Sequence, residues 1–574
     1  FILIVNFCVG ILEMLTIASI LPLMITLVSP QTFVNENFGM IYNFFSVESK
    51  NEFALILALI MGLLATISVV FSILNIWLTN KFIFTLGAEL SSKLFNYYML
   101  LDFKTFIKEP TSELVGKILL QTQRYADGVI GSFLIIFQRI SSIMILTFLL
   151  LIVNFNITIF SLLILSLFYY FYFRNIKKKV SDLGYENTNL IQVRQKILQD
   201  NLNCAKELKI YDKENLFIDI FRKFSLKFAH NVSFNRTVSS SPRYVLELII
   251  IIMALVFMIY YFNTKLGILN DVVPIATVFV FSIYKIMPSA QSIFSSLSSM
   301  NSEIHAYDKF KADLKNFDKP KEKIKIYNPI KFENEISFKN ISFNFKDEDN
   351  NTKILDDISF KIRKNEILGI FGKSGSGKTT LLNIISSLLV PEKGDIYIDK
   401  FKLNNDQYNS YKKNIAFVTQ STMVFNDTIE KNITLYDNKP NRENLNKSIN
   451  LSGLDNFIKS LPNGLETQIG EKGSKISGGQ LQRISIARAI YNDRKVLLLD
   501  EFTSALDPVT ETKLLNYIKN LKNTTIILST HKLELLNFCN GIIGLKDGKI
   551  KFNEKVNFEN QFSKKELLKA YLWF

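Results

Sequence analysis

The residues that usually build disulfides and metal sites are scarce in this chain. Its 574 residues include only three cysteines and three histidines. Cys8, Cys204 and Cys539 lie far apart and without metal-type spacing, so neither a disulfide framework nor a zinc site is indicated. His531 is the only histidine after residue 305. His531 is therefore the only candidate for a catalytic histidine in the last part of the chain.

Acidic residues are too few to balance the basic ones. The chain has 67 Lys and Arg against 52 Asp and Glu, a formal net charge of +15. Such an excess is compatible with nucleic-acid binding or with basic cytoplasmic loops of a membrane protein. We favour the loops, because the positive charge is concentrated between apolar runs, and we expect no nucleic-acid partner.

Apolar and aromatic residues are abundant, with 48% hydrophobic residues, 49 Phe and 22 Tyr. The chain is too long for a single core. Residues 1–300 contain long apolar runs, whereas residues 301–574 have the composition of a soluble α/β domain. The sequence starts "FILIVNF" without Met, so we expect residues to be missing before Phe1.

Six stretches are long and apolar enough to cross a membrane as helices of roughly 20 residues. They are residues 1–28, 53–79, 129–153, 156–173, 245–262 and 272–296. The third and fourth are separated by "NFN", which suits a tight outer turn. Apolar residues recur every three or four positions in the two long spacers, which predicts helices there.

The distribution of basic residues predicts how these spans are oriented. Residues 174–244 contain fourteen Lys and Arg, whereas the segments near 29–52, 154–155 and 263–271 are almost free of them. Basic loops remain in the cytoplasm. The two long spacers and both ends of the six-span unit are therefore expected inside, and the domain that follows is expected in the cytoplasm.

Four ionisable residues fall within the predicted spans: Glu13, Arg139, Glu247 and Lys285. Such residues usually face a cavity or a partner. One interpretation is that they line a path for polar or anionic cargo. The other, which fits equally well, is that they form ion pairs between helices or extend to the membrane surface.

A phosphate-binding loop follows the β-run "EILGIFG" and precedes the apolar helix "TLLNIISSLL". Its residues are Gly372, Lys373, Ser374, Gly375, Ser376, Gly377, Lys378 and Thr379, followed by Thr380. This is G-x-x-x-x-G-K-[ST] in strand–loop–helix context, which predicts a P-loop. Glycines let backbone N–H groups converge on a phosphate. Lys378 then reaches the β- and γ-phosphates of ATP, and the Thr379 hydroxyl binds Mg²⁺.

The segment "KVLLLDE" predicts a buried strand that ends at two carboxylates. Asp500 is expected to hold Mg²⁺, and Glu501 is expected to polarise the attacking water as general base. His531 follows another β-run, "IILSTHK". A lone histidine at a strand end is usually structural, but together with Glu501 we expect it to orient water near the γ-phosphate.

With "ISGGQLQR", these motifs resemble the ABC-transporter ATPase domain over residues 336–555. The resemblance implies that Gln420 of "AFVTQ" contacts Mg²⁺, that "SALD" up to Asp507 forms the D-loop, and that Phe345 stacks on adenine. "GEKG" (470–473) resembles the stretch that touches the membrane domain in exporters. Ile476 stands where the family usually has Leu, a volume-conserving replacement.

The segment "ISGGQ" first suggests a second phosphate grip on the same nucleotide, at a helix N-terminus. The resemblance implies a different arrangement. Ser477, Gly478, Gly479 and Gln480 would cap the γ-phosphate that the partner chain's P-loop holds, so ATP is sandwiched between two chains. With six spans and one ATPase domain in each chain, we expect a homodimer.

The resemblance extends to the whole domain order of an exporter half-transporter. The predicted fold is an all-α six-helix transmembrane domain (1–300), a linker (301–335) and an α/β P-loop ATPase domain (336–574). Short helices in the two inner loops, near residues 104–114 and 203–214, are expected to couple the domains. The family mechanism is alternating access, driven by ATP binding and hydrolysis.

Weaker likeness in "SSPRYVLE" (240–247) and "YKIMPSAQ" (284–291) points to PglK-type flippases of lipid-linked oligosaccharides for protein glycosylation. The basic residues Arg139, Arg243 and Lys285 can meet a diphosphate there. An exporter of peptides, drugs or other lipids is the alternative, and an ATP-gated channel or regulator is a third reading. Six spans exclude a soluble ABC ATPase. The expected location is the bacterial inner membrane.

Overall fold

The computed structural model describes most of the chain in two compact units. The described residues are 1–28, 50–264, 269–317, 330–345, 353–404, 407–503, 506–521 and 523–555. Residues 1–101 and 105–321 form one unit, and residues 102–104 and 322–574 form the other. We call them the helical unit and the α/β unit.

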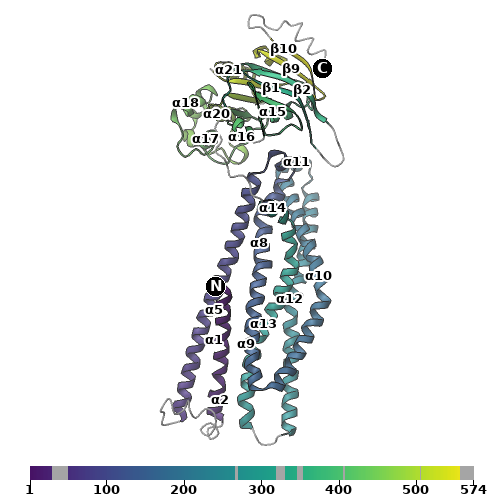
Figure 1. Cartoon of the computed structure of the whole chain (residues 1–574), viewed down its shortest axis with the longest axis vertical. Helices are drawn as coiled ribbons and strands as arrows, with labels where there is room; N and C mark the ends of the chain where they lie inside the picture. Colours follow the sequence, from purple (N-terminus) through teal and green to yellow (C-terminus); the bar gives the residue numbers. More distant parts are fainter. Residues whose placement is uncertain are drawn as a thin grey trace. The chain divides into compact units, whose positions relative to one another are not determined.

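Long helices make up the helical unit and lie side by side within it (Figure 1). Their bounds are α1 Ile2–Ala18, α2 Ile20–Val28, α5 Lys50–Met99, α9 Ser132–Val153, α10 Phe155–Asn203, α12 Glu214–Thr264 and α13 Leu269–Asp308. Shorter helices are α6 Phe103–Phe106, α7 Thr111–Val115, α8 Thr122–Tyr125, α11 Ala205–Ile210 and α14 Lys311–Phe317. Two π-helical turns, η1 Gly116–Gln121 and η2 Ala126–Gly131, interrupt the helix that becomes α9.

Five helices in the described residues are long and apolar enough to cross a membrane. They are Ile2–Leu27, Asn51–Met99, Thr111–Val153, Phe155–Asn203 and Val273–Asp308, and each contains or overlaps one predicted span. The remaining predicted span, 245–262, lies within α12, whose side chains from residue 253 onward are outside the described residues. Residues 29–49 and 265–268, in the predicted loops near 29–52 and 263–271, also lie outside them.

Local chemistry explains two features of these helices. The tight turn predicted at "NFN" is confirmed: α9 ends at Val153, and the Asn154 side chain caps α10 by accepting from Ile157 N at 3.2 Å. Pro242 lies inside α12 and cannot donate a backbone hydrogen bond to Val238. The Tyr172 hydroxyl of α10 donates to the Val238 carbonyl oxygen at 3.2 Å instead.

The short helices near the two predicted inner-loop segments are present. Helices α6 and α7 fall in or beside residues 104–114, and α11 lies in residues 203–214. Helix α13 continues to Asp308, past the predicted end of the membrane domain at residue 300. Hydropathy marks the end of an apolar run, whereas a helix can continue into water with polar residues.

The α/β unit contains two sheets. A four-stranded antiparallel sheet has the order β2-β1-β4-β5, and a six-stranded sheet has the order β10-β9-β3-β8-β7-β6. Strands β9, β3, β8, β7 and β6 run parallel. Their bounds are β1 Glu335–Asn344, β2 Lys353–Arg363, β3 Ile367–Phe371, β4 Lys393–Ile398, β5 Phe401–Lys402, β6 Ile415–Val418, β7 Val496–Asp500, β8 Thr525–Thr530, β9 Gly541–Lys546 and β10 Lys549–Lys555.

Helices complete the α/β unit (Figure 1). They are α15 Lys378–Ile385, α16 Gln407–Lys412, α17 Ile429–Thr434, α18 Arg442–Leu451, α19 Asp455–Ser460, α20 Gly478–Tyr491 and α21 Pro508–Lys519. Short 3₁₀ helices are η3 Gly464–Glu466, η4 Glu471–Gly473 and η5 Leu533–Phe538. Strands β7 and β8 are buried along their whole length, as expected for central parallel strands. The residues at and just after their carboxyl ends form part of the candidate site.

Candidate active site

The P-loop joins β3 to α15, as the motif predicts. Gly377 has φ +99° and directly precedes α15, a conformation that glycine adopts without strain. A Cβ on Gly372 would lie 2.4 Å from the Leu545 carbonyl oxygen, so only glycine allows the strand to pass so closely. Lys373, Ser374 and Gly375 are exposed at the tip of the loop. The backbone of the loop tip is therefore accessible to a ligand.

Lys378 begins α15 and points back into the loop. Its Nζ donates to the carbonyl oxygens of Gly372 at 2.8 Å and Lys373 at 3.0 Å. The same nitrogen lies 3.5 Å from Oε1 of Glu501. The ammonium group is buried and surrounded by acceptors, so it places a fixed positive charge beside the carboxylate.

Asp500 ends β7 and is 2% exposed. Its Oδ2 accepts from the Thr379 hydroxyl at 2.9 Å, and its Oδ1 accepts from the Ser529 hydroxyl at 2.5 Å. These hydroxyls satisfy a buried carboxylate that would otherwise be costly. The predicted Mg²⁺ ligands Thr379 and Asp500 are thus brought into direct contact.

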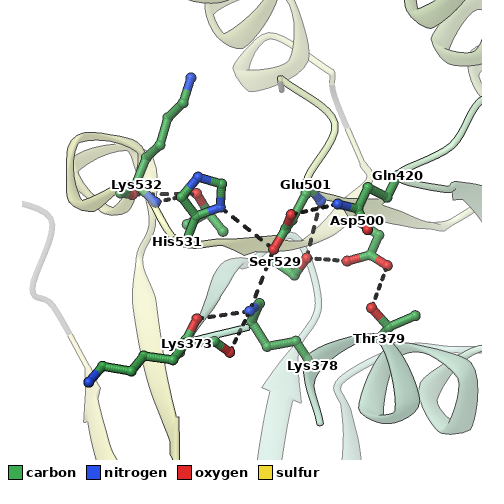
Figure 2. Close-up of polar contacts among 11 residues, drawn as sticks. Lys373, Lys378, Thr379, Gln420, Asp500, Glu501, Ser529, His531 and Lys532 are labelled. Atoms are coloured by element: carbon green, nitrogen blue, oxygen red, sulfur yellow. Dashed lines mark hydrogen bonds and ion pairs between the residues drawn. The ribbon is translucent and has the colours of Figure 1, made fainter. Parts of the chain in front are cut away.

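Glu501 follows β7 with φ +42°, a conformation that is uncommon for a residue with a side chain. Its backbone N–H donates to the Ser529 carbonyl oxygen and hydroxyl, both at 3.2 Å. Its carboxylate accepts from Gln420 Nε2 at 2.9 Å and lies 3.6 Å from His531 Nδ1. Figure 2 shows these groups converging from the P-loop and the ends of β6, β7 and β8.

The residue that sequence reasoning missed is Ser529. It bonds both Asp500 and Glu501 from the neighbouring parallel strand β8. The sequence signal was its position two residues before His531 in "IILSTHK". No motif marks this serine, because its role depends on strand pairing.

Ser477 lies at the N-cap of α20 and forms a capping box with Gln480. Gln480 N donates to Ser477 Oγ at 3.3 Å, and Ser477 N donates to Gln480 Oε1 at 2.9 Å. Gly478 and Gly479 form the first turn of α20. Ser477 and Gln480 therefore form hydrogen bonds with each other and not with the P-loop of the same chain.

Asp507 and Phe345 also have local contacts. Asp507 caps α21 by accepting from Thr510 N at 3.0 Å, and hydrogen bonds from Thr510 lower the pKa of its carboxyl group. Phe345 is half-buried and packs edge-on to Phe343, with ring centroids 5.1 Å apart. The predicted D-loop residues 504 and 505 lie outside the described residues.

The donor set suits ATP and Mg²⁺. Ser376 Oγ is buried in the P-loop and has no hydrogen-bond partner among the described residues, so a polar ligand can satisfy it. Thr379, Asp500 and Gln420 supply oxygen ligands, which Mg²⁺ prefers alongside phosphate oxygens. No group of three His, Cys, Asp or Glu that could hold a metal occurs among the described residues. A Mg²⁺ site here would therefore depend on hydroxyl, amide and phosphate oxygens.

Comparisons with known proteins agree with this arrangement. The family model described as "ABC transporter" matches residues 355–504, and the model described as "ABC transporter transmembrane region" matches residues 14–241. Together these two matches place the chain in the ABC transporter family, with a transmembrane region followed by an ABC ATPase domain. It is a multi-pass membrane protein. The predicted family and domain order are confirmed.

Curated relatives match over part of the chain. An ATP-dependent lipid A-core flippase of Desulfotalea psychrophila is 40% identical over 220 residues, 38% of each chain. The flippase of the same name in Burkholderia thailandensis is 35% identical over 216 residues, 38% of this chain and 36% of the relative. An export ATP-binding/permease protein of Rickettsia typhi is 39% identical over 216 residues, which cover 38% of this chain and 37% of the relative. The matches span less than two-fifths of each relative.

A solved structure of a bacterial Atm1-family ABC exporter with ATP bound resembles the whole chain. The TM-score is 0.76 with 19% sequence identity, and the match covers 98% of this chain and 97% of the other. At this identity the likeness shows the fold. The predicted all-α membrane domain followed by an α/β ATPase domain is confirmed.

Proposed function

We propose that this protein is an ATP-driven exporter that couples hydrolysis of ATP to transport by alternating access. The observation that carries the proposal is the convergence of Lys378, Gln420 and His531 on the Glu501 carboxylate. The Thr379–Asp500 contact lies beside it. One carboxylate is positioned for a water molecule, and the other is paired with a hydroxyl suited to Mg²⁺.

In this mechanism the P-loop binds the phosphates of ATP, with Lys378 moving from the loop carbonyls to the β- and γ-phosphates. Glu501 accepts a proton from the attacking water. Gln420 and His531 hold that carboxylate and the water in line. When bound by Thr379, Asp500 and Gln420, Mg²⁺ would supply positive charge that stabilises the phosphates as negative charge moves during transfer.

The proposed working unit is a homodimer. The first turn of α20 has exposed residues at Ser477 and Gly478, and its N–H groups suit an anion. We assign this turn to the γ-phosphate held by the partner chain, with Gln480 and Asp507 beside it. Phe345 is assigned to adenine stacking.

The proposed cargo is a lipid-linked oligosaccharide, moved from the inner to the outer leaflet of the bacterial inner membrane. It is supported by the likeness of residues 240–247 and 284–291 to PglK-type flippases. The names of the lipid A-core flippases support a lipid cargo more generally. Export of peptides, drugs or other lipids is the second candidate, and a gated channel or regulator is the third.

ATP turnover tests the catalytic assignment. The purified protein should hydrolyse ATP, and Glu501→Gln should bind ATP but lose at least about a hundredfold in kcat, as is typical for removal of a general base. Glu443→Gln also replaces a carboxylate by an amide, but at an exposed position in α18, and should retain full turnover. Near-normal turnover by Glu501→Gln would refute the assignment of the base.

Reconstituted vesicles test the cargo. ATP-dependent flipping of a lipid-linked oligosaccharide supports the leading proposal. Flipping of lipid A or another lipid, without movement of the oligosaccharide, would favour the second candidate. Electrical conductance without transport would favour the channel.

A further inference from the structure

A polar cavity lies inside the helical unit, among α1, α5, α9 and α13. Its volume is about 210 Å³. Its polar lining includes Ser68 and Ser72 from α5, Gln138 and Ser142 from α9, and three charged residues. Polar groups at membrane depth are costly unless they face a cavity or a partner. This lining therefore needs a polar occupant or water.

The three charged residues of the cavity are Glu13, Arg139 and Lys285. Lys285 Nζ donates to Glu13 Oε1 at 3.3 Å, which joins α13 to α1. Arg139 has a buried Nε with no hydrogen-bond partner among the described residues. One carboxylate and two cations thus line the cavity, so the lining carries an excess positive charge.

Arg243 was the third basic residue considered from the sequence. It forms an ion pair with Glu247 one turn along α12, at 3.0 Å, and both side chains are exposed. It does not line the cavity. The positive charge that could meet a buried anion is therefore carried by Arg139 and Lys285.

The lining also includes apolar side chains that are exposed. Val69, Ile73 and Ile76 line the cavity from α5 and are 57%, 62% and 54% exposed. A lining that combines charged groups with exposed apolar side chains matches a molecule with a charged head and hydrocarbon chains. The volume is large enough for a phosphate group.

The depth of the cavity fits the inner leaflet. Arg139 lies fourteen residues before the end of α9 at Val153, roughly 20 Å along a helix. The hydrocarbon core is about 30 Å thick. With the turn at Asn154 on the outer side, as the basic loops predict, Arg139 lies about 10 Å above the inner boundary of that core.

We propose that this cavity binds the phosphate headgroup of a lipid, with Arg139 as the principal anion contact. The Glu13–Lys285 pair sets the charge of the site. Arg139 donates to the phosphate oxygens, as guanidinium groups do with bidentate geometry. The acyl or prenyl chains extend past Val69, Ile73 and Ile76. This inference deepens the proposed lipid export by naming the chemical group recognised at the cavity.

Binding to the full-length protein in detergent, without ATP, tests the proposal. The probes are dihexanoyl phosphatidic acid, uncharged dihexanoyl glycerol and inorganic phosphate, with affinity measured by native mass spectrometry. We expect phosphatidic acid to bind in preference to both others. Arg139→Gln should weaken its binding about tenfold or more, the loss expected for a charge-assisted contact. Arg174→Gln removes the same charge at an exposed position of α10 and should leave binding unchanged.

Glu13→Gln makes an opposite prediction. It releases Lys285 from its carboxylate, adds one net positive charge, and should strengthen phosphatidic acid binding several-fold. Misfolding would not strengthen binding of phosphatidic acid while leaving that of the uncharged lipid unchanged. Equal binding of the uncharged lipid, no effect of Arg139→Gln, or weaker binding in Glu13→Gln would each overturn the proposal. Tighter binding of inorganic phosphate would overturn its lipid part.

The result is separable from the ATPase assignment. Loss of lipid binding with normal ATP turnover in Arg139→Gln would support this site without reference to Glu501. If the wild-type protein bound phosphatidic acid but hydrolysed no ATP, the proposed exporter function would fail while the cavity assignment stood.

Discussion

The side chains of the candidate active site converge on the carboxylate of Glu501. It accepts from Gln420 and lies near Lys378 and His531, while its backbone is held at φ +42° by Ser529. A strained backbone persists only where its surroundings determine it. Here the two bonds to β8 supply that constraint. The carboxylate is thereby pointed at the P-loop before any ligand binds.

Sequence spacing predicted most individual positions in this cluster, because P-loop chemistry requires particular residue types at fixed intervals. It could not predict Ser529, whose two contacts arise from the pairing of β7 with β8. It also assigned Gln420 to Mg²⁺ and did not predict its bond to Glu501. Long-range contacts of this kind are set by register between strands, which no local pattern encodes.

Asp399 provides a residue-scale prediction about stability. Its carboxylate accepts from the backbone N–H groups of Glu333, Asn334 and Glu335 at 2.7–3.0 Å. Burial raises its pKa, but these three bonds together lower it below the usual value. Asp399→Asn should destabilise the α/β unit by about 1–3 kcal/mol at pH 7. The melting temperature in detergent should fall accordingly.

The pH dependence of that effect has a definite sign. Because the folded pKa is depressed, the ionised group stabilises the fold above the unfolded pKa of about 3.9. That contribution is lost as the pH falls through the folded pKa. The difference between wild type and Asp399→Asn should therefore shrink below about pH 4. Asp395→Asn, which removes an exposed pair with Lys402, should have little effect. A constant Asp399 difference from pH 7 to pH 3 would contradict this account.

At the scale of elements, hydropathy located the long helices but not their interruptions. The π-helical turns η1 and η2 follow each other closely before α9, and π-turns often mark functional segments. Pro242 leaves the Val238 carbonyl oxygen without a backbone N–H four residues on, and the Tyr172 hydroxyl donates to that oxygen. The sequence did not predict this contact either. Both features depend on how neighbouring helices pack, whereas length and apolar content are visible along the chain.

The crossing of α10 and α13 makes an element-scale prediction. A Cβ on Gly184 would lie 2.4 to 2.9 Å from the backbone O, Cα and C of Ser302. Backbone atoms cannot rotate away, so Gly184→Ala must separate the two helices. We expect a loss of about 1–3 kcal/mol, typical of overpacking, seen as a lower melting temperature in detergent.

Gly62→Ala is the matched control. An added Cβ at Gly62 of α5 meets nothing within 4 Å, so this change should be neutral or slightly stabilising through helix propensity. If both alanine variants melted at the wild-type temperature, the close approach of α10 to α13 would be wrong.

At the scale of the whole molecule, the sequence predicted the domain order because each domain carries its own strong pattern. It did not identify the cargo. The charged residues of the spans were compatible with either ion pairing or a cargo path. The structure shows an ion pair between Glu13 and Lys285 at the wall of a cavity that Arg139 also lines; the cargo path is our proposal. Their grouping depends on the mutual rotation of four helices, which hydropathy does not determine.

In the proposed homodimer, two chains share each ATP site. This proposal rests on the exposed capping turn at Ser477 and on the P-loop tip at Ser374, which is also exposed. Cysteine cross-linking can join these positions between chains. Cys8 and Cys204 are exposed and are first replaced by Ser, whereas Cys539 is buried. Burial raises the pKa of the Cys539 thiol, so it should not react.

The most direct measurement is ATP-dependent cross-linking of Ser374→Cys/Ser477→Cys in the Glu501→Gln background, using a short bis-maleimide. We predict a covalent dimer of twice the chain mass with ATP and Mg²⁺, little dimer without ATP, and little dimer from either single cysteine variant. Cross-linking confined to single chains, or a dimer yield that ATP does not change, would contradict the shared site.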